Sequence, residues 1–196
     1  MAADGKAIQS YAGKISKKNS GNKGERDADW CRKEYTITKP NGEKVVKTKK
    51  WFGFRLHLLS DATYELPVDY EVTKASNSEL KETEKLLDNI KEKYPECAVT
   101  LSLGEYQKSD YEKMKNAGAD RYLLRHETIC KEHYEKLHPQ NMSYDNRLRC
   151  LKDLKDIGFQ VGSGFLVGSP YQREDIIAKE FKTIEEFSTE MCGNGE

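Results

Sequence analysis

The residues best suited to chemistry lie where predicted strands end. Glu105 follows the apolar stretch 98–103, Arg125 and Glu127 close the next strand, and the glycine-containing run 162–168 closes a third. In parallel α/β sheets, ligands bind at the carboxyl ends of the strands. These side chains therefore predict a binding site. The alternative is a structural ion pair between Arg125 and a neighbouring carboxylate.

Positive charge is concentrated in the first third of the chain. Residues 1–60 hold 14 Lys and Arg against six Asp and Glu, although the whole chain carries 33 of each and no formal net charge. The Lys-rich residues 14–50, with clusters at 17–18 and 47–50, could contact the phosphates of DNA, which would make binding sensitive to salt. A solvated basic loop is an equal alternative. The aromatic run 51–54 is more typical of a core than of base stacking.

The cysteines do not predict a metal site. They stand at positions 31, 97, 130, 150 and 192, so no two are spaced as a C-x-x-C ligand pair. This usage is typical of reduced, structural thiols. No apolar run approaches the roughly 18 residues of a membrane span, and the N-terminus lacks the apolar core of a signal peptide. We expect a cytoplasmic chain that has no membrane partner.

The elements of the first half are expected to be few. The polar residues 12–50 carry repeated turn signals and predict a disordered basic loop. Strands over 51–59 and 68–72 predict a hairpin. A helical period then begins after Ser78 and stops before Pro95.

The second half alternates strands with helices. The predicted strands cover 98–103, 121–127, 160–167 and 190–192, and the predicted helices cover 109–118, 129–137, 143–157 and 174–187. Repeats of this length imply parallel pairing through right-handed crossovers. Ser109-x-x-Glu112 indicates a capping box at the first of these helices. Four strands make half of an eight-stranded barrel and leave open edges, which predicts self-association visible as oligomers on size exclusion.

The motifs of the first half resemble the catalytic domain of bacterial insertion-sequence transposases of the DDE class. They are Asp4-Gly5-Lys6-Ala7-Ile8-Gln9-Ser10, Asp27-Ala28-Asp29-Trp30, Lys50-Trp51-Phe52-Gly53-Phe54-Arg55-Leu56-His57-Leu58, Asp61-Ala62-x-Tyr64-Glu65-Leu66-Pro67 and Glu71-Val72-Thr73-Lys74-Ala75-Ser76. The resemblance covers about residues 3–90. It implies an RNase H-like sheet with Asp4 as the first of three carboxylates that hold two Mg²⁺ ions. The other two carboxylates are missing, so we expect no Mg²⁺ here. Taken alone, the Asp4-Gly5 pair is more typical of a turn.

The motifs of the second half closely resemble the radical S-adenosylmethionine maturases of [FeFe]-hydrogenase, relatives of biotin synthase. They are Thr100-Leu-Ser-Leu-Gly-Glu105, Ala117-Gly-Ala-Asp-Arg-Tyr-Leu-Leu-Arg-His-Glu-Thr128, Lys136-Leu-His-Pro139, Asn146-Arg-Leu-Arg-Cys-Leu151, Gly162-Ser-Gly-Phe-Leu-Val-Gly168 and Glu190-Met-Cys-Gly193. The resemblance implies a (β/α)8 barrel in which a [4Fe-4S] cluster cleaves S-adenosylmethionine. Carried over by position, Arg125 and Glu127 would face the methionine part, Arg147 would pair with its carboxylate, and Glu105 would line the barrel mouth. For His126, a packing role is an equal alternative.

One departure from that family decides our expectation. The family's C-x-x-x-C-x-x-C loop is absent from this chain, and an iron–sulfur cluster needs clustered thiolates. We therefore predict an α/β chimera, with a partial RNase H-like transposase segment over 1–93 and about four parallel strands of a radical S-adenosylmethionine barrel over 94–196. It would retain cofactor-contacting residues but be inactive alone. The alternative function is that of a remnant transposase with residual DNA binding.

Overall fold

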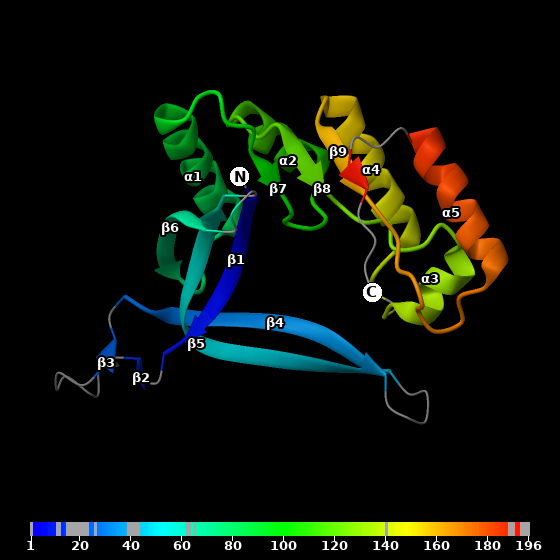
Figure 1. Ribbon diagram of the computed structural model, residues 1–196. Helices are drawn as coiled ribbons and strands as arrows, with labels where there is room; N and C mark the ends of the chain where they lie inside the picture. Colours follow the sequence, from blue (N-terminus) through cyan, green and yellow to red (C-terminus); the bar gives the residue numbers. More distant parts are fainter. Residues whose placement is uncertain are drawn as a thin grey trace. The chain divides into compact units, whose positions relative to one another are not determined.

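The chain folds into two compact units, Met1–Cys97 and Ala98–Glu196. The structure is a computed structural model that describes residues 2–10, 13–14, 24–25, 27–38, 44–61, 64, 66–139, 141–187 and 191–192 (Figure 1). Within these ranges, no helix is both long enough and apolar enough to cross a membrane.

The long strand β5 (Lys44–Ser60) organises the first unit. Its first part pairs antiparallel with β4 (Asp29–Thr38), and its second part lies between β1 (Ala2–Gln9) and β6 (Pro67–Lys74), antiparallel to both (Figure 1). The pairing of β5 with β6 confirms the hairpin expected at 51–59 and 68–72. The two-residue strands β2 (Gly13–Lys14) and β3 (Gly24–Glu25) pair with each other in parallel.

The prediction of a disordered loop over 12–50 is wrong for β4 and the start of β5. These strands form a ribbon in which Asp29 lies opposite Gly53 and Thr38 lies opposite Lys44. Side chains 46–50 are all exposed, so the ribbon is not held by burial along that stretch. The hydrogen bonds between the two strands pair their backbone N–H and C=O groups. Hydrophobicity patterns do not report these bonds, so the ribbon left no sign in the sequence.

Helix α1 (Glu79–Lys93) lies against β5 and β6, as expected from its period. Glu79 pairs with Arg55 of β5 at 3.6 Å, and Lys93 pairs with Asp69 of β6 at 3.8 Å. Leu86, Leu87 and Ile90 are buried on the helix. Acidic residues in the first turn and basic residues in the last turn oppose the partial charges of the helix ends.

One face of strand β6 carries apolar side chains that are exposed. Val68, Tyr70 and Val72 alternate along the strand and are 38%, 66% and 48% exposed. Among the strands of the first unit, β6 pairs with β5 alone. An edge strand with exposed apolar side chains can pair with a strand of another chain. Self-association of this chain stays a prediction.

The second unit is a parallel sheet covered by helices, which confirms the expected α/β class (Figure 1). Its strands β7 (Thr100–Leu101), β8 (Arg121–Leu123), β9 (Gln160–Ser163) and β10 (Met191–Cys192) pair in that order. Its helices are α2 (Lys108–Asn116), α3 (Lys131–Leu137), α4 (Tyr144–Ile157) and α5 (Glu174–Phe187). The core between them contains the fully buried side chains of Leu101, Tyr111, Met114, Tyr122, Leu154 and Val161.

Helix α4 follows its sequence signals, but α2 does not. The Ser143 side chain caps α4 by accepting from the Asn146 N–H at 3.2 Å, and Gly158 ends it in the left-handed conformation. The capping box predicted at Ser109 is wrong, because α2 begins at Lys108 and its N-cap is Gln107, which makes no side-chain cap bond.

Candidate functional site

The loop after β7 is held in place by two buried phenols. The Gly104 carbonyl accepts hydrogen bonds from the hydroxyls of Tyr111 at 3.1 Å and Tyr122 at 2.9 Å. The Tyr106 N–H in turn donates to the Tyr111 hydroxyl at 2.9 Å. Burial raises the pKa of both phenols well above the usual value, so they remain neutral hydroxyls. These bonds fix the backbone on both sides of Glu105.

Glu127, in the loop after β8, has a strained backbone conformation. Glu127 has φ +68°, which is uncommon for a residue other than glycine. Its N–H donates to the Gly164 carbonyl at 3.0 Å, and its own carbonyl accepts from the Leu166 N–H at 2.9 Å. Two backbone bonds thus hold the strained conformation. Such outliers concentrate at functional sites.

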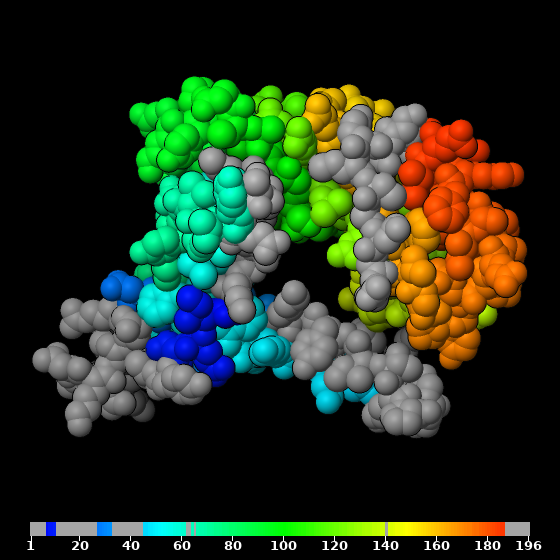
Figure 2. All heavy atoms as spheres, in the orientation of Figure 1, coloured from blue at the N-terminus to red at the C-terminus, as the bar shows by residue number. Residues whose placement is uncertain are grey.

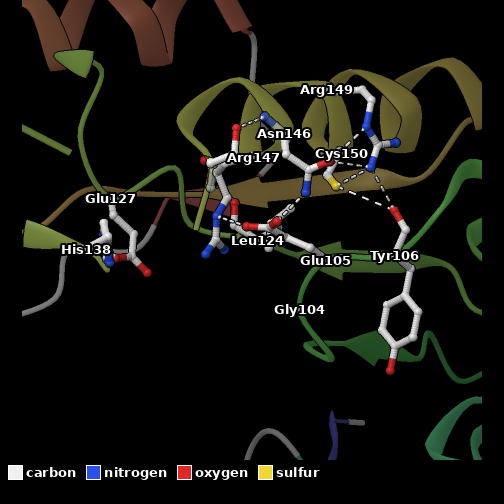
Figure 3. A network of polar contacts seen from close by, with 12 residues as sticks. Gly104, Glu105, Tyr106, Leu124, Glu127, His138, Asn146, Arg147, Arg149 and Cys150 are labelled. Carbon is white, nitrogen blue, oxygen red and sulfur yellow. Dashed lines mark hydrogen bonds and ion pairs between the residues drawn. The ribbon is translucent and has the colours of Figure 1, made fainter. Parts of the chain in front are cut away.

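Two close contacts between oppositely ionisable side chains lie at these strand ends (Figure 3). Arg147 Nε of α4 lies 2.7 Å from Glu105 Oε1, and His138 Nε2 lies 2.9 Å from Glu127 Oε2. Asn146 also donates to the other oxygen of Glu105. The Arg147 residue is only 8% exposed, so this guanidinium is a largely buried charge.

Four buried polar atoms of this cluster fall outside strict hydrogen-bond geometry, although two close contacts join them to neighbouring groups and Tyr134 contacts Arg147. They are Glu105 Oε1, Tyr134 OH, His138 Nε2 and Arg147 Nε, and among the described residues the only other such side-chain atom is Trp51 Nε1. In neither of the two close contacts does an N–H point at the oxygen in strict hydrogen-bond geometry. Because buried polar groups are nearly always hydrogen-bonded in native proteins, this concentration of exceptions marks the cluster as a candidate site. We call these four residues the orphan cluster.

The charges around the orphan cluster are strongly coupled. Burial acts against the charged form of Arg147, but contact with Tyr134 and the Glu105 carboxylate outweighs it and raises the arginine pKa. Burial raises the pKa of Tyr134, and the nearby arginine only partly offsets this. Burial also lowers the pKa of His138, and Glu127 only partly restores it. At neutral pH the cluster therefore contains a permanent cation, a neutral phenol and a neutral imidazole beside carboxylates.

The structure brings together three of the residues expected from sequence. Glu105, Glu127 and Arg147 lie in one region at the carboxyl ends of β7 and β8 (Figure 3). Arg125 is exposed, and a role for it at this site stays a prediction. His126 is buried and bonded to Ser163 and Glu180, which supports the packing alternative.

Asp4 lies on β1 opposite Leu58, and its side chain lies outside the described residues. Within the part of the chain that the structure describes, no group of three or more His, Cys, Asp or Glu could hold a metal ion. Among the described residues, none is therefore assigned to a [4Fe-4S] cluster or to a pair of Mg²⁺ ions.

Two members of the orphan cluster were missing from the residues proposed by sequence. Tyr134 and His138 lie on α3 and at its end, and their rings are 4.2 Å apart between centroids. His138 lies inside the motif Lys136-Leu-His-Pro139, so a signal was present without an assigned role.

Comparison with known proteins relates the chain to two families. The model of the transposase DDE domain matches residues 22–155, a range that continues beyond the transposase-like motifs into α4. The chain is also 48% identical over 98 residues to the [FeFe] hydrogenase maturase subunit HydE of Thermotoga maritima, covering 50% of this chain and 28% of that protein. It is 30% identical over 104 residues to the biotin synthase of Rhodopirellula baltica, covering 53% of this chain and 28% of that protein. The chain thus spans less than a third of the length of these relatives.

Two solved structures share part of this chain's fold. Methylornithine synthase (PylB) matches with a TM-score of 0.53 and 20% identity, over 60% of this chain and 34% of that chain. Coproporphyrinogen III oxidase (HemN) from Escherichia coli, described as a radical SAM enzyme, matches with a TM-score of 0.50 and 15% identity, over 60% of this chain and 28% of that chain. The family model and the relatives above confirm both resemblances drawn from the motifs, which is consistent with a chimera.

Proposed function

We propose that the second unit of this chain binds S-adenosylmethionine. The premise is that the chain belongs to the transposase DDE domain family and also carries a fragment of a radical S-adenosylmethionine maturase. The proposal locates the amino-acid end of the ligand in the orphan cluster. It further holds that the chain does not cleave the ligand by itself.

The observation that carries this proposal is the group of four buried polar atoms that contact one another or a carboxylate closely but outside strict hydrogen-bond geometry. An α-amino acid presents a carboxylate and an ammonium group, and the cluster offers a donor for the first and acceptors for the second. The Arg147 guanidinium and the Tyr134 hydroxyl would donate to the carboxylate. Glu105 and Glu127 would accept from the ammonium group.

Each residue of the site has a physical task in binding. The raised pKa of Arg147 keeps its charge at every accessible pH, so the carboxylate is always met by a cation. The strained backbone at Glu127 aims a carboxylate at the same region without a rearrangement on binding. Low exposure of Arg147 strengthens the electrostatic attraction by excluding water.

Inactivity is supported by the cysteine positions. The chain lacks the C-x-x-x-C-x-x-C run of the maturase family, and its described residues do not supply a metal-binding group of three donors. Reconstitution with iron and sulfide, followed by reduction and assay for 5′-deoxyadenosine, should give no cluster-dependent cleavage. Substantial turnover would contradict the inactivity.

Equilibrium dialysis with S-adenosylmethionine tests the binding proposal. Arg147→Gln should weaken binding at least about tenfold, because it removes a charge-assisted contact of about 1.5–3 kcal/mol. Lys152→Gln changes an exposed charge on the same helix and should leave binding unchanged. Absence of binding by the unmodified chain, or equal binding by both variants, would contradict the site.

A second candidate function, DNA binding, is favoured by the ribbon of β4 and β5. Trp30 is 54% exposed although its ring lies 5.5 Å from that of buried Phe52. In the antiparallel register Trp30 lies opposite Phe52, and Arg32 lies opposite Lys50, so all four occupy one face because side chains alternate. An exposed indole beside cations can stack on a base while the cations contact phosphates.

An electrophoretic mobility-shift series with single-stranded and duplex DNA over increasing salt tests this second function. Trp30→Ala should weaken binding by about 1–3 kcal/mol if the ring stacks on a base. Lys50→Gln should reduce the dependence on salt, while Lys81→Gln on the exposed surface of α1 serves as the matched control. Binding that is absent, or equally affected by all three variants, would remove DNA binding as a function of the ribbon.

A further inference from the structure

We propose that His138 is a proton-controlled gate on the orphan cluster, whose imidazolium form occupies Glu127 and whose neutral form leaves Glu127 to a cationic ligand group. This inference rests on the proposed ligand site and adds a means of regulating it. It concerns a residue inside the motif Lys136-Leu-His-Pro139 that had no role assigned from the sequence.

The geometry places His138 in direct competition with a ligand. Its Nε2 is 2.9 Å from Glu127 Oε2, the position that a ligand ammonium group would occupy. The side chains are only 14% and 24% exposed, so solvent screens this contact weakly. The contact lies outside strict hydrogen-bond geometry, so the ring nitrogen touches the carboxylate without being firmly bonded to it.

The ring cannot easily leave this position. The His138 N–H donates to the Tyr134 carbonyl at 2.9 Å, which fixes the backbone at the end of α3. The Tyr134 ring packs against the imidazole with 4.2 Å between centroids. Protonation of the ring, without movement of the side chain, is therefore the simplest way to change the charge next to the Glu127 carboxylate.

Every charged group that faces the ring is part of the same site. Glu127 after β8 and Glu105 after β7 favour the imidazolium, while Arg147 of α4 opposes it. Tyr134 of α3 stays neutral because burial raises its pKa. Burial of the imidazole is the largest effect, and the net result is a His138 pKa below the ordinary 6.5. At pH 7.5 the ring is thus neutral, and Glu127 faces no full positive charge from it.

The consequence is a ligand affinity that depends on pH. Above the His138 pKa, an ammonium group gains the uncompensated Glu127 carboxylate. Below it, the ligand must first displace a proton from the imidazole, so the affinity falls about tenfold for each pH unit. Variants of His138 are needed to assign such a pH dependence to this ring.

The test measures binding of S-adenosylhomocysteine to the full chain by calorimetry at pH 7.5 and pH 5.5. The unmodified chain should bind more weakly at the lower pH, whereas His138→Gln should show a clearly smaller loss. Tyr134→Phe is expected to bind more weakly but to keep the pH dependence, because it leaves the titrating ring in place. Equal pH dependence in the unmodified chain and His138→Gln would overturn the gate.

A second readout requires no ligand. The proton resonance of His138 Cε1–H, followed by NMR against pH, should give a lower pKa in Glu127→Gln than in the unmodified chain, because Glu127 raises it. An unchanged pKa would also overturn the gate. Complete absence of S-adenosylhomocysteine binding at both pH values would instead reject the proposed function, and a bound ligand without pH dependence would reject the gate alone.

Discussion

Two buried polar clusters lie in the second unit, and only one is complete. In the first, His126 Nδ1 lies 2.8 Å from Ser163 Oγ and His126 Nε2 lies 2.8 Å from Glu180 Oε2, while the other Glu180 oxygen accepts from the Ile129 N–H at 2.7 Å. The second, the orphan cluster, has similar residue types but leaves four buried atoms outside strict hydrogen-bond geometry. Similar residue types are therefore fully hydrogen-bonded in one cluster and only partly hydrogen-bonded in the other.

The difference shows how a structural histidine can be told from a candidate ligand-binding one. Each ring nitrogen of His126 already has a partner, so the network ties α5 to β8 and β9. His138 instead contacts Glu127 without an aligned hydrogen bond. A fully satisfied network stabilises the fold, whereas a partly satisfied one has a cost that ligand binding can remove.

Disruption of the complete cluster should have the largest effect on stability. Glu180→Leu leaves the His126 imidazole and the Ile129 N–H buried without their carboxylate, and should lower the free energy of unfolding by about 3–5 kcal/mol. Urea denaturation followed by circular dichroism measures this. Glu186→Leu, at an exposed position of the same helix, is the control. A loss below about 1 kcal/mol would mean that the network is not structural.

Removing one orphan hydroxyl should separate stability from binding. Tyr134→Phe deletes a buried hydroxyl whose contact with Arg147 lies outside strict hydrogen-bond geometry, so the free energy of unfolding should fall by less than about 0.5 kcal/mol. Tyr144→Phe removes a hydroxyl that donates to the Ile129 carbonyl at 2.7 Å, and should cost about 1 kcal/mol. Thermal unfolding and S-adenosylhomocysteine titration of both variants check the contrast. Greater destabilisation by Tyr134→Phe would contradict the distinction.

The smallest effect concerns His57 of the first unit. Its Nε2 lies 3.1 Å from Thr73 Oγ1, and burial lowers its pKa. The unfolded chain therefore binds a proton before the folded chain does, and stability should fall as pH drops below about 6.5. Denaturation at pH 7.5 and 5.5 should show a smaller fall in His57→Gln than in the unmodified chain. An equal fall in both would assign the dependence to other groups.

The sequence predicts those elements whose signals are local. Ser143 and Gly158 bracket α4 because both act on their own helix ends. The hairpin of β5 and β6 follows from two apolar stretches separated by a turn. By contrast, the capping box expected at Ser109 was wrong, because α2 begins at Lys108 and Ser109 already lies inside its first turn.

The candidate site could be predicted only in part. Glu105 and Glu127 were expected from the rule that ligands bind where parallel strands end, and Arg147 from the family resemblance. The contact of His138 with Glu127 joins the end of α3 to the loop after β8, which depends on tertiary packing. The departures from strict hydrogen-bond geometry are also invisible in a sequence, because they depend on the alignment of N–H groups.

The most direct measurement follows the ring protons of both histidines by NMR while S-adenosylhomocysteine is added to the full chain at pH 7.5. The account predicts a saturable shift of the His138 resonance and little change at His126, whose nitrogens are already engaged. The same titration of Arg147→Gln should show no saturation over that range. An unmoved His138 resonance, or an equal shift of both histidines, would contradict the claim that the orphan cluster is a ligand site.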